Sequence, residues 1–473
     1  MAYTPSADQS AYIAELLAMA KGKKLLLQAE GGCGKTTSTA FAIAELLKQD
    51  AEASIACIAP THRAKMQLFS QLTSFLTLQQ LKQVHCFTSA RFTGLGLKEN
   101  LPTGQLDKFY TAGGLYTDNW RLVIADEVSM IQKAELNRLL STDNTTVFMG
   151  DEAQAKPVRG KLSSIFCETF RKEHDITCLE LTINHRQDLT LYNVGHPTRT
   201  REHYPDSNSS ANQVHDSREA LVSAFLDKAR NEPFGDFAYL AFTNKQVNET
   251  TKLYREQVLN SPNAWLQGER LRIISHPKLN NGDLATIKAI CHTLQEVVHG
   301  VSFIVQEAII QDEEGDTHFM KLLAPGQEAK LAEARAYFQS EGDKAMQRQE
   351  PSTAAKWWRL RSGLSDAFDT ATSAMCCTVL KSQGSTIDTV FVDTKDIKRY
   401  GTSKKHLLYV AFSRASRFIH SIHIDNKLSP AHAFRKHCKT LGIKQLRADV
   451  YAKQLAKPGW SEQKHIEYWT ARK

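Results

Sequence analysis

The pattern of hydrophobic and polar positions divides the chain into segments of different character. Short apolar runs at 25–27, 55–59, 122–125 and 146–149 are separated by polar residues and by stretches with helical periodicity. Apolar runs of this length, alternating with amphipathic helices, are typical of strands buried in a parallel sheet. The first part of the chain is therefore predicted to form an α/β unit.

A second α/β pattern begins near residue 237. The apolar run 237–242 leads into a helical stretch, and further strands are predicted at 390–392 and 419–424. Proline, serine and asparagine are frequent at 196–217, which predicts a loop or linker between the two units. The pattern therefore predicts two α/β units in series, and 473 residues are ample for several domains.

Two insertions interrupt this alternation. Residues 269–322 contain short alternating strands with turn sequences, which predicts a small β-barrel, and helices are predicted after it. The second of those helices carries Trp357 and Trp358, which are either core residues or a platform for stacking bases. Segments 95–101 and 105–110 flank Pro-Thr-Gly, and this predicts a β-hairpin.

Composition narrows the classes of function. The formal net charge is +8 and the sequence pI about 8.9, which favours a polyanionic partner. Nine scattered cysteines without a CxxC pair predict a reduced, cytosolic protein without a zinc site. No apolar run approaches the roughly 18 residues of a membrane span, so we expect no membrane association.

The end of the chain is strongly basic. From Lys427 onwards there are 11 lysine and arginine residues and 3 acids, and 11 − 3 gives +8. Aromatic residues are interleaved with these cations, as they are in segments that bind nucleic acid. The alternative is an ordinary solvated face.

A glycine-rich segment links the first predicted strand to a helix. In this context such a loop is typical of a phosphate-binding loop, because its backbone N–H groups can surround a polyphosphate. Lys35 would reach the outer phosphates, and the Thr36 hydroxyl would bind Mg²⁺. The alternative is a plain glycine turn. The residues expected to contact the nucleotide are Gly31, Gly32, Cys33, Gly34, Lys35, Thr36 and Thr37.

Acidic and amide side chains follow two later strands. Asp126 and Glu127 come directly after 122–125, where one acid could hold Mg²⁺ and the other could polarise the attacking water. Taken alone, an Asp-Glu pair is as well explained as a helix cap. Gln154 follows the strand at 146–149 and could sense a terminal phosphate.

Taken in order, these segments resemble the motifs of superfamily 1 helicases of the 5′-to-3′ branch, most closely the phage Dda-type DNA helicases and more distantly the RecD-type enzymes. The resemblance covers roughly residues 5–425. The matching segments beyond the phosphate loop are Ala59-Pro60-Thr61-His62, Asp126-Glu127-Val128-Ser129-Met130, Gly150-Asp151-Glu152-Ala153-Gln154 with Pro157-Val158, Phe242-Thr243-Asn244-Lys245, Lys381-Ser382-Gln383-Gly384 and Leu407-Leu408-Tyr409-Val410-Ala411-Phe412-Ser413-Arg414.

The resemblance implies two RecA-like domains with ATP and Mg²⁺ between them. Lys35, Thr36, Asp126, Glu127 and Gln154 would come from the first domain. It also implies that Gln9 reads the adenine, that Gly384 lines the cleft, and that Arg186 and Arg414 neutralise the transition state. The implied division is 1–85 and 119–184 for the first motor domain, 86–118 for a pin hairpin, 185–275 and 371–427 for the second motor domain, 276–370 for an SH3-like barrel with a helical tower, and 428–473 for a basic extension.

The same resemblance implies contacts with single-stranded and forked DNA. Translocation would run 5′ to 3′, in replication or recombination, by a phage or bacterial cytosolic protein expected to be a monomer that works beside single-strand-binding proteins. Either Phe109 or Tyr110 on the pin would meet the fork. The residues expected to contact DNA are Pro60, Thr61, His62, Ser89, Phe109, Tyr110, Thr243, Asn244, Trp357, Trp358 and Lys381.

Three positions depart from the family pattern. Ala29 replaces the first glycine of the phosphate loop, Leu380 stands where histidine is usual, and Thr88 occupies another histidine position. The last two place some DNA contacts in question rather than ATP hydrolysis. Two other functions remain open on sequence grounds, an RNA-directed superfamily 1 helicase and a DNA-binding module without catalysis.

Overall fold

The computed structural model describes residues 3–100, 102, 105–110, 120–154, 163–279, 281–400 and 404–424. Several predicted features lie outside these residues, namely the Pro157-Val158 pair and the basic extension 428–473. The backbone of 105–110 is described but its side chains are not, so the predicted roles of Phe109 and Tyr110 stay predictions.

The first α/β unit is built on a parallel sheet with the strand order β3-β2-β6-β7-β1-β8. Its strands are β1 (Lys24–Ala29), β2 (Ile55–Ala59), β3 (Val84–Thr88), β6 (Leu122–Ala125), β7 (Thr146–Gly150) and β8 (Ile176–Leu181). The helices are α1 (Ala7–Ala18), α2 (Lys35–Gln49), α3 (His62–Thr73), α4 (Leu78–Leu81), α5 (Ser89–Phe92), α6 (Lys133–Leu140) and α7 (Glu168–Glu173), with short 3-10 helices at Val128–Met130 and Ser164–Phe166.

Both faces of this sheet are covered. Leu25 and Leu27 of β1 belong to the hydrophobic cluster that α1 and α2 complete, whereas Leu26 belongs to a cluster on the opposite face. Successive strand side chains point to opposite faces, so a strand buried on both sides must be apolar throughout. This explains why the first strands were readable as continuous apolar runs.

The second α/β unit also has a parallel sheet, with the order β16-β10-β17-β18-β9. Its strands are β9 (Asn212–His215), β10 (Phe237–Ala241), β16 (Cys376–Thr378), β17 (Ile387–Val392) and β18 (Ala415–Ile422). The helices are α8 (Leu189–Gly195), α9 (Arg218–Asn231), α10 (Asn244–Gln257), α13 (Thr394–Tyr400) and α14 (Lys404–Phe412), with 3-10 helices at His196–Arg199 and Val379–Ser382. The two predicted α/β units are confirmed.

One part of the second sheet was not predicted. Strand β9 lies inside the segment 196–217, which the sequence analysis assigned to a loop or linker, and that assignment is wrong for Asn212–His215. This strand is short and lies at the sheet edge, where only β18 pairs with it. Such a strand needs few apolar residues, so no apolar run marks it in the sequence.

A third, antiparallel sheet has the order β14-β13-β12-β11-β15. A parallel bridge between Leu322 and Asp369 joins the end of β14 to the residue before β15. Its strands are β11 (Arg270–Ser275), β12 (Leu284–Val298), β13 (Val301–Asp312), β14 (Thr317–Leu323) and β15 (Thr370–Ser373). The helices α11 (Glu328–Gln347) and α12 (Pro351–Asp366) lie between β14 and β15 in the chain. The segment 269–322 thus forms strands, as predicted, but β12 and β13, with 15 and 12 residues, are longer than the short strands expected, and the β-barrel stays a prediction.

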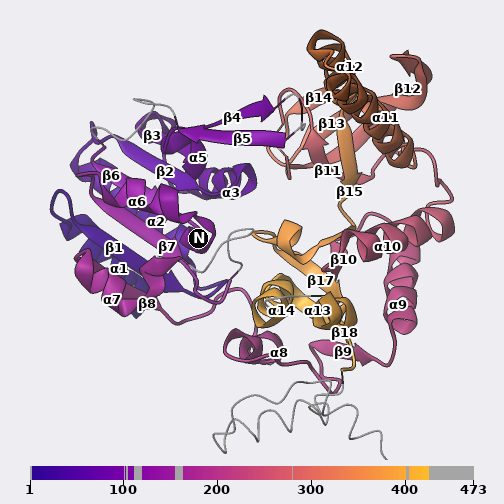
Figure 1. The fold of residues 1–473 in the computed structure, drawn as a ribbon. Coiled ribbons are helices and arrows are strands. Elements are labelled where there is room, and N and C mark those ends of the chain that lie inside the picture. The colour runs from indigo at the N-terminus through magenta and orange to yellow at the C-terminus, as the bar shows by residue number, and fades with distance from the viewer. Residues whose placement is uncertain are drawn as a thin grey trace, which may run out of the picture.

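The hairpin consists of β4 (Leu95–Asn100) and β5 (Gln105–Tyr110), paired in register from Leu95 with Tyr110 to Asn100 with Gln105. It extends from the first unit toward the third sheet (Figure 1). There the Nε2 of Gln339 on α11 donates a hydrogen bond of 2.7 Å to the Pro102 carbonyl. The hairpin and the helical insertion therefore meet, although they are far apart in sequence.

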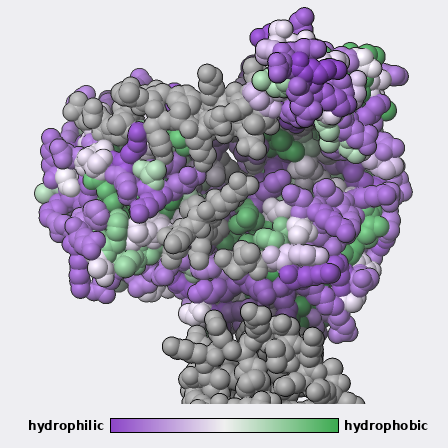
Figure 2. All heavy atoms as spheres, viewed as in Figure 1, coloured by the Kyte–Doolittle hydropathy of each residue, from purple (hydrophilic) through white to green (hydrophobic). Residues whose placement is uncertain are grey.

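The coloured part of the face shown in Figure 2 is mainly polar. Hydrophilic residues cover most of the visible face of the α11 and α12 pair (Figure 2). Within the described ranges, the helices lack the combination of length and apolar character that crossing a bilayer requires.

Candidate nucleotide site between two sheets

The glycine-rich segment lies at the carboxyl end of β1 and leads into α2, which begins at Lys35. The Nζ of Lys35 donates hydrogen bonds to the carbonyls of Ala29 (2.7 Å) and Glu30 (3.0 Å). Ala29 is the last residue of β1 and pairs with Leu181, so it has extended backbone. Alanine is therefore acceptable where the family pattern has glycine.

Gly32 is required by both its conformation and its surroundings. Its φ is 98°, and an added Cβ would lie 2.8 Å from the Cβ of Arg186 and 2.8 Å from the Oδ1 of Asn184. The Nδ2 of Asn184 donates to the Gly31 carbonyl (3.0 Å), and the His185 amide donates to the Gly32 carbonyl (2.8 Å). The segment that carries Arg186 is therefore held directly against the phosphate loop.

Asp126 and Glu127 follow β6 at the same edge of the sheet. Burial raises the pKa of the Asp126 carboxyl, while the Lys35 ammonium, the Glu127 amide and the Thr36 hydroxyl act in the opposite direction. Glu127 has left-handed backbone, with φ 48° and ψ 43°. A non-glycine residue in that region costs on the order of 1 kcal/mol, and such residues cluster at functional sites.

This edge has the oxygen ligands that Mg²⁺ prefers. The Asp126 carboxylate interacts with the Thr36 hydroxyl, and both groups are hard donors. Among the described residues no cluster of three or more His, Cys, Asp or Glu side chains could hold a metal by itself. The donor set fits Mg²⁺ that is bound mainly through nucleotide phosphates, which usually needs only one or two protein ligands.

Two arginine side chains approach the phosphate loop, Arg186 from the segment after β8 and Arg414 from the segment after α14. Arg414 is buried at the end of α14, and its guanidinium donates to the Val410 carbonyl (3.0 Å), the Ser385 carbonyl (3.3 Å) and the Ser413 hydroxyl (2.9 Å). Burial, together with the positive charge of Arg186, lowers the pKa of Arg414 to about 10. Both arginines still carry a charge at neutral pH, so a buried anion between them would be strongly favoured.

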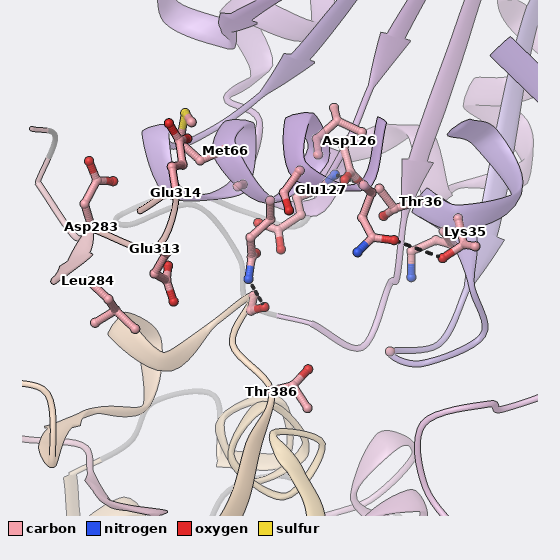
Figure 3. A pocket seen from close by; sticks show the side chains of 18 of the residues that line it. Lys35, Thr36, Met66, Asp126, Glu127, Asp283, Leu284, Glu313, Glu314 and Thr386 are labelled. Atoms are coloured by element: carbon pink, nitrogen blue, oxygen red, sulfur yellow. Dashed lines mark hydrogen bonds between the residues drawn. The ribbon is translucent and has the colours of Figure 1, made fainter. Parts of the chain in front are cut away.

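A cavity of about 840 Å³ is lined by the phosphate loop and by both arginines. In Figure 3, Lys35, Thr36, Asp126 and Glu127 lie on one side of the cavity and Thr386 on the other. The lining residues that the sequence analysis had selected are Gly31, Gly32, Gly34, Lys35, Thr36, Thr37, Asp126, Glu127, Gln154, Arg186, Gly384 and Arg414. Cys33 is buried beside them and does not line the cavity.

Two hydrogen bonds from glutamine side chains join the units across the cavity. The Nε2 of Gln383 donates to the Oε1 of Gln154 (3.4 Å), and Gln67 of α3 donates to the Gly384 carbonyl. Gly384 has a φ of 83°, and an added Cβ would clash with the Gln67 amide oxygen. The predicted coupling residue Gln154 thus contacts the second unit directly.

Gln9 lies in the first turn of α1, behind the phosphate loop. Its Nε2 donates to the Cys33 carbonyl (3.1 Å), and its Oε1 accepts from the Tyr3 hydroxyl (2.9 Å) and the Ser6 amide (3.0 Å). The residue is buried rather than solvated. Its predicted contact with adenine is not tested by this arrangement.

The candidate DNA contacts lie at the carboxyl ends of strands in both units. Pro60 is half-buried and Thr61 and His62 are exposed after β2, and the Thr61 hydroxyl caps α3 by accepting from the Ala64 amide (3.1 Å). Thr243 and Asn244 follow β10, and Lys381 is exposed after the neighbouring strand β16. This edge is where open α/β sheets place their ligands.

Two candidate DNA contacts are inaccessible in this structure. Trp358 is only 6% exposed and packs in the cluster between α11 and α12, while the half-buried Trp357 stacks on Phe338. Ser89 is 2% exposed, and its hydroxyl donates to the Glu135 carboxylate (3.3 Å). Trp358 and Ser89 are therefore corrected to packing residues, and the core interpretation of the tryptophan pair is favoured.

Several residues at the site were not selected from the sequence. Tyr409 and Asp151 occur inside quoted motifs, yet their spacing gave no indication of the hydrogen bond of 2.6 Å that joins them. The cavity is also lined by an acidic turn of the third sheet, which includes Glu313 and Glu314 (Figure 3). Contacts between distant segments leave no local signal in a single sequence.

Comparisons with known proteins agree with this geometry. The model of the AAA domain family matches residues 14–160, and that of the UvrD-like helicase C-terminal domain matches residues 373–418. A curated relative, the ATP-dependent DNA helicase dda of Enterobacteria phage T4, is 25% identical over 258 residues, which are 53% of this chain and 56% of the relative. The match thus spans about half the length of that relative.

Solved structures are also similar. One is described as "Structural Basis for DNA Unwinding at Forked dsDNA by two coordinating Pif1 helicases", with 14% identity, a TM-score of 0.49, and coverage of 94% of this chain and 100% of the other. Another is the Pif1 helicase from Candida albicans, with 15% identity, a TM-score of 0.44, and coverage of 96% and 100%.

Proposed function

We propose, from the confirmed resemblance of this chain to superfamily 1 helicases of the Dda type, that it is an ATP-dependent DNA helicase that moves 5′ to 3′ along single-stranded DNA and separates duplex strands. The observation that carries the proposal is the cavity that the two parallel sheets share. One side presents a phosphate loop with two acids, and the other presents Arg414. This is the arrangement that phosphoryl transfer to water requires.

Each side chain has a distinct role in the proposed hydrolysis. Lys35 binds the outer phosphates, and Thr36 with Asp126 would hold Mg²⁺, which neutralises phosphate charge when bound. Glu127 orients the attacking water and accepts its proton. Arg186 and Arg414 stabilise the negative charge that spreads over the γ-phosphate in the transition state.

Movement follows from the position of the site between two units. ATP interacts with groups on both sides of the cavity, whereas ADP lacks the γ-phosphate that would contact the two arginines. Hydrolysis therefore weakens the attraction between the units. If each unit holds single-stranded DNA in turn through Thr61, His62, Thr243, Asn244 and Lys381, the cycle becomes directional movement with low sequence preference.

We further propose that the parallel sheets are two RecA-like motor domains, at 1–85 with 119–184 and at 185–275 with 371–427. The hairpin 86–118 would be the strand-separating pin, and the antiparallel sheet with α11 and α12, at 276–370, would be an SH3-like barrel and tower. Because β11 and β15 pair within the third sheet, its boundaries are better placed at 270 and 373. The contact between Gln339 and Pro102 supports a role for tower and pin together.

The test is unwinding of forked duplexes that carry either a 5′ or a 3′ single-stranded tail, with ATP and Mg²⁺. We expect unwinding of the 5′-tailed substrate only. Lys35→Ala serves as the control that removes motor activity. Unwinding of the 3′-tailed substrate alone would contradict the proposed direction.

The RNA-directed alternative needs a separate measurement. Contacts with backbone and stacked bases discriminate weakly between sugars, so sequence and geometry alone do not choose. ATPase stimulation is measured with DNA and RNA oligomers of the same sequence and length. Stronger stimulation by RNA would replace DNA as the proposed substrate.

A further inference from the structure

A compact group of polar side chains joins the two parallel-sheet units beside the proposed ATP site. Glu30 lies in the phosphate loop directly after β1, and Asp151 follows β7, so both belong to the first unit. Arg199 ends the 3-10 helix after α8, and Tyr409 lies on α14, so both belong to the second unit. Asp151 is fully buried, and the side chains of Arg199 and Glu30 are only 16% and 11% exposed.

Arg199 bridges the two acids. One guanidinium nitrogen pairs with the Glu30 carboxylate, and the other lies 3.1 Å from the Oδ1 of Asp151. The remaining Asp151 oxygen accepts a hydrogen bond of 2.6 Å from the Tyr409 hydroxyl. That hydroxyl in turn accepts a hydrogen bond of 3.1 Å from the Gly31 amide of the phosphate loop. The chain of contacts thus runs from Arg199 to the phosphate loop.

The charges favour this bridge where the two units meet. Burial lowers the pKa of Arg199, but Asp151 and Glu30 raise it by more, so the guanidinium is held in its charged form. Burial and the Asp151 carboxylate raise the pKa of Tyr409, which keeps its hydroxyl as a neutral donor. Without the guanidinium, the buried Asp151 would lose its ion-pair partner, and Glu30 would keep only the Tyr192 hydroxyl and His196 as side-chain partners.

Resting on the proposed function, we propose that Arg199 is a positioning residue for ATP hydrolysis. By bridging Glu30 and Asp151 it stabilises the closed arrangement, in which Arg186 and Arg414 face the phosphate loop and Tyr409 is oriented on Gly31. Arg199 itself does not line the cavity, so it acts through these groups. The contact forms only when the two units meet, so its free energy favours the closed state over the open state.

A matched ion pair elsewhere distinguishes positioning from ordinary stabilisation. Arg218 pairs with the buried Asp393 through two nitrogens, and both residues belong to the second unit. Like Arg199, Arg218 pairs with a fully buried aspartate, but it contacts one acid rather than two, and opening of the cleft leaves this pair intact. Arg218→Lys is therefore the control for Arg199→Lys.

The experiment measures DNA-stimulated ATP hydrolysis and affinity for fluorescent ADP in Arg199→Ala and Arg199→Lys. We expect Arg199→Ala to lower kcat between about 5- and 150-fold, the usual range for a coupling between sites. ADP affinity should change less than about twofold, because ADP does not depend on the arginines of the second unit. Lysine keeps the charge but cannot bridge both acids as a fork, so Arg199→Lys should recover part of kcat.

A double-mutant cycle tests the path through Tyr409. Tyr409→Phe removes the hydroxyl that joins Asp151 to Gly31 while keeping the ring. If Arg199 acts through this hydroxyl, the loss of kcat in the double variant should be clearly smaller than the product of the two single losses. A loss of kcat in the double variant equal to the product of the two single losses would overturn the proposed path.

Three outcomes separate the inference from the proposed function. An inactive wild-type protein would refute the proposed ATPase itself. A normal kcat in Arg199→Ala, with the wild-type protein active, would overturn the positioning role alone. An equal fall of kcat in Arg218→Lys and Arg199→Lys, with equal loss of Tm, would assign Arg199 to general stability and would also overturn the proposal.

Discussion

The two parallel sheets are alike in their interiors and different at the edges that meet. In both sheets, successive residues of an interior strand pack into hydrophobic clusters on opposite faces, as Leu25 and Leu26 do in β1 and Ala238 and Tyr239 do in β10. At the cleft, the first sheet presents a lysine with two acids, whereas the second presents a buried arginine.

This difference divides the proposed chemistry between binding and activation. The first edge has what a Mg²⁺-bound polyphosphate requires, namely loop amides, a cation and hard oxygen ligands. The second edge supplies charge that counts only when the cleft is closed. We therefore expect each unit alone to be inactive. Variants at the first edge should lose nucleotide affinity, whereas variants at the second edge should lose kcat.

The largest effect is expected at the first edge. Lys35→Ala removes the cation that reaches the outer phosphates, so ATP hydrolysis should fall to background and nucleotide affinity should fall with it. Steady-state ATPase and fluorescent-nucleotide binding measure both, and circular dichroism checks that the chain is folded. Near-normal turnover would show that the phosphate loop is assigned wrongly.

At the second edge, Arg414→Ala should lower kcat by about 10³-fold or more, because it removes charge stabilisation of the transition state. Affinity for ADP should stay near the wild-type value, in contrast to Lys35→Ala. Because Arg414 is buried, Arg414→Lys is measured beside Arg414→Ala, and the Tm of both variants checks that they are folded. Loss of ADP binding in a folded Arg414 variant would contradict the proposal that the first edge binds the nucleotide and the second edge activates hydrolysis.

Glu127→Gln sharpens the comparison within the first edge. The amide cannot accept the proton of the attacking water, so kcat should fall by about 10²–10⁴-fold. ATP binding should persist, since the side chain is proposed to contact only the water. The measurement is single-turnover hydrolysis beside equilibrium ATP binding, and a variant that no longer binds ATP would contradict the assigned role.

The hairpin should behave differently from both edges. Replacing Phe109 and Tyr110 together by alanine should slow unwinding by about tenfold, as expected for losing ~1.4 kcal/mol of base stacking. DNA-stimulated ATPase should be largely retained, because the cleft is untouched. A parallel fall of ATPase and unwinding would make the hairpin part of the motor rather than a pin.

The smallest effect is expected from the basic extension. Truncation after Asn426 should weaken DNA binding mainly at low salt and flatten the dependence of affinity on salt. Each lost phosphate contact should change that slope by about 0.7 for single-stranded DNA. Binding titrations between low and moderate salt measure it. If the dependence of DNA affinity on salt is unchanged, the extension is better interpreted as an ordinary solvated face.

Some features follow from local sequence because their physical cause is local. Gly32 and Lys35 are recognisable because a phosphate loop needs a left-handed glycine and a following helix start within a few residues. The acids after β6 are recognisable for a similar reason, since a buried apolar strand ends directly before them. Strand β9 had no such signal, because it is an edge strand of 4 residues in which Val214 is the only apolar side chain.

The tertiary structure decided which of the remaining polar and aromatic residues meet. The sequence allowed Trp358 to be either core or a stacking platform, and packing of α11 on α12 selected the core. Sequence spacing could not place Arg199 between Glu30 and Asp151, because the three residues come together only where two separate sheets approach. Local patterns thus determined the sheets, the phosphate loop and its acids, whereas contacts across the cleft depend on long-range packing that no single segment encodes.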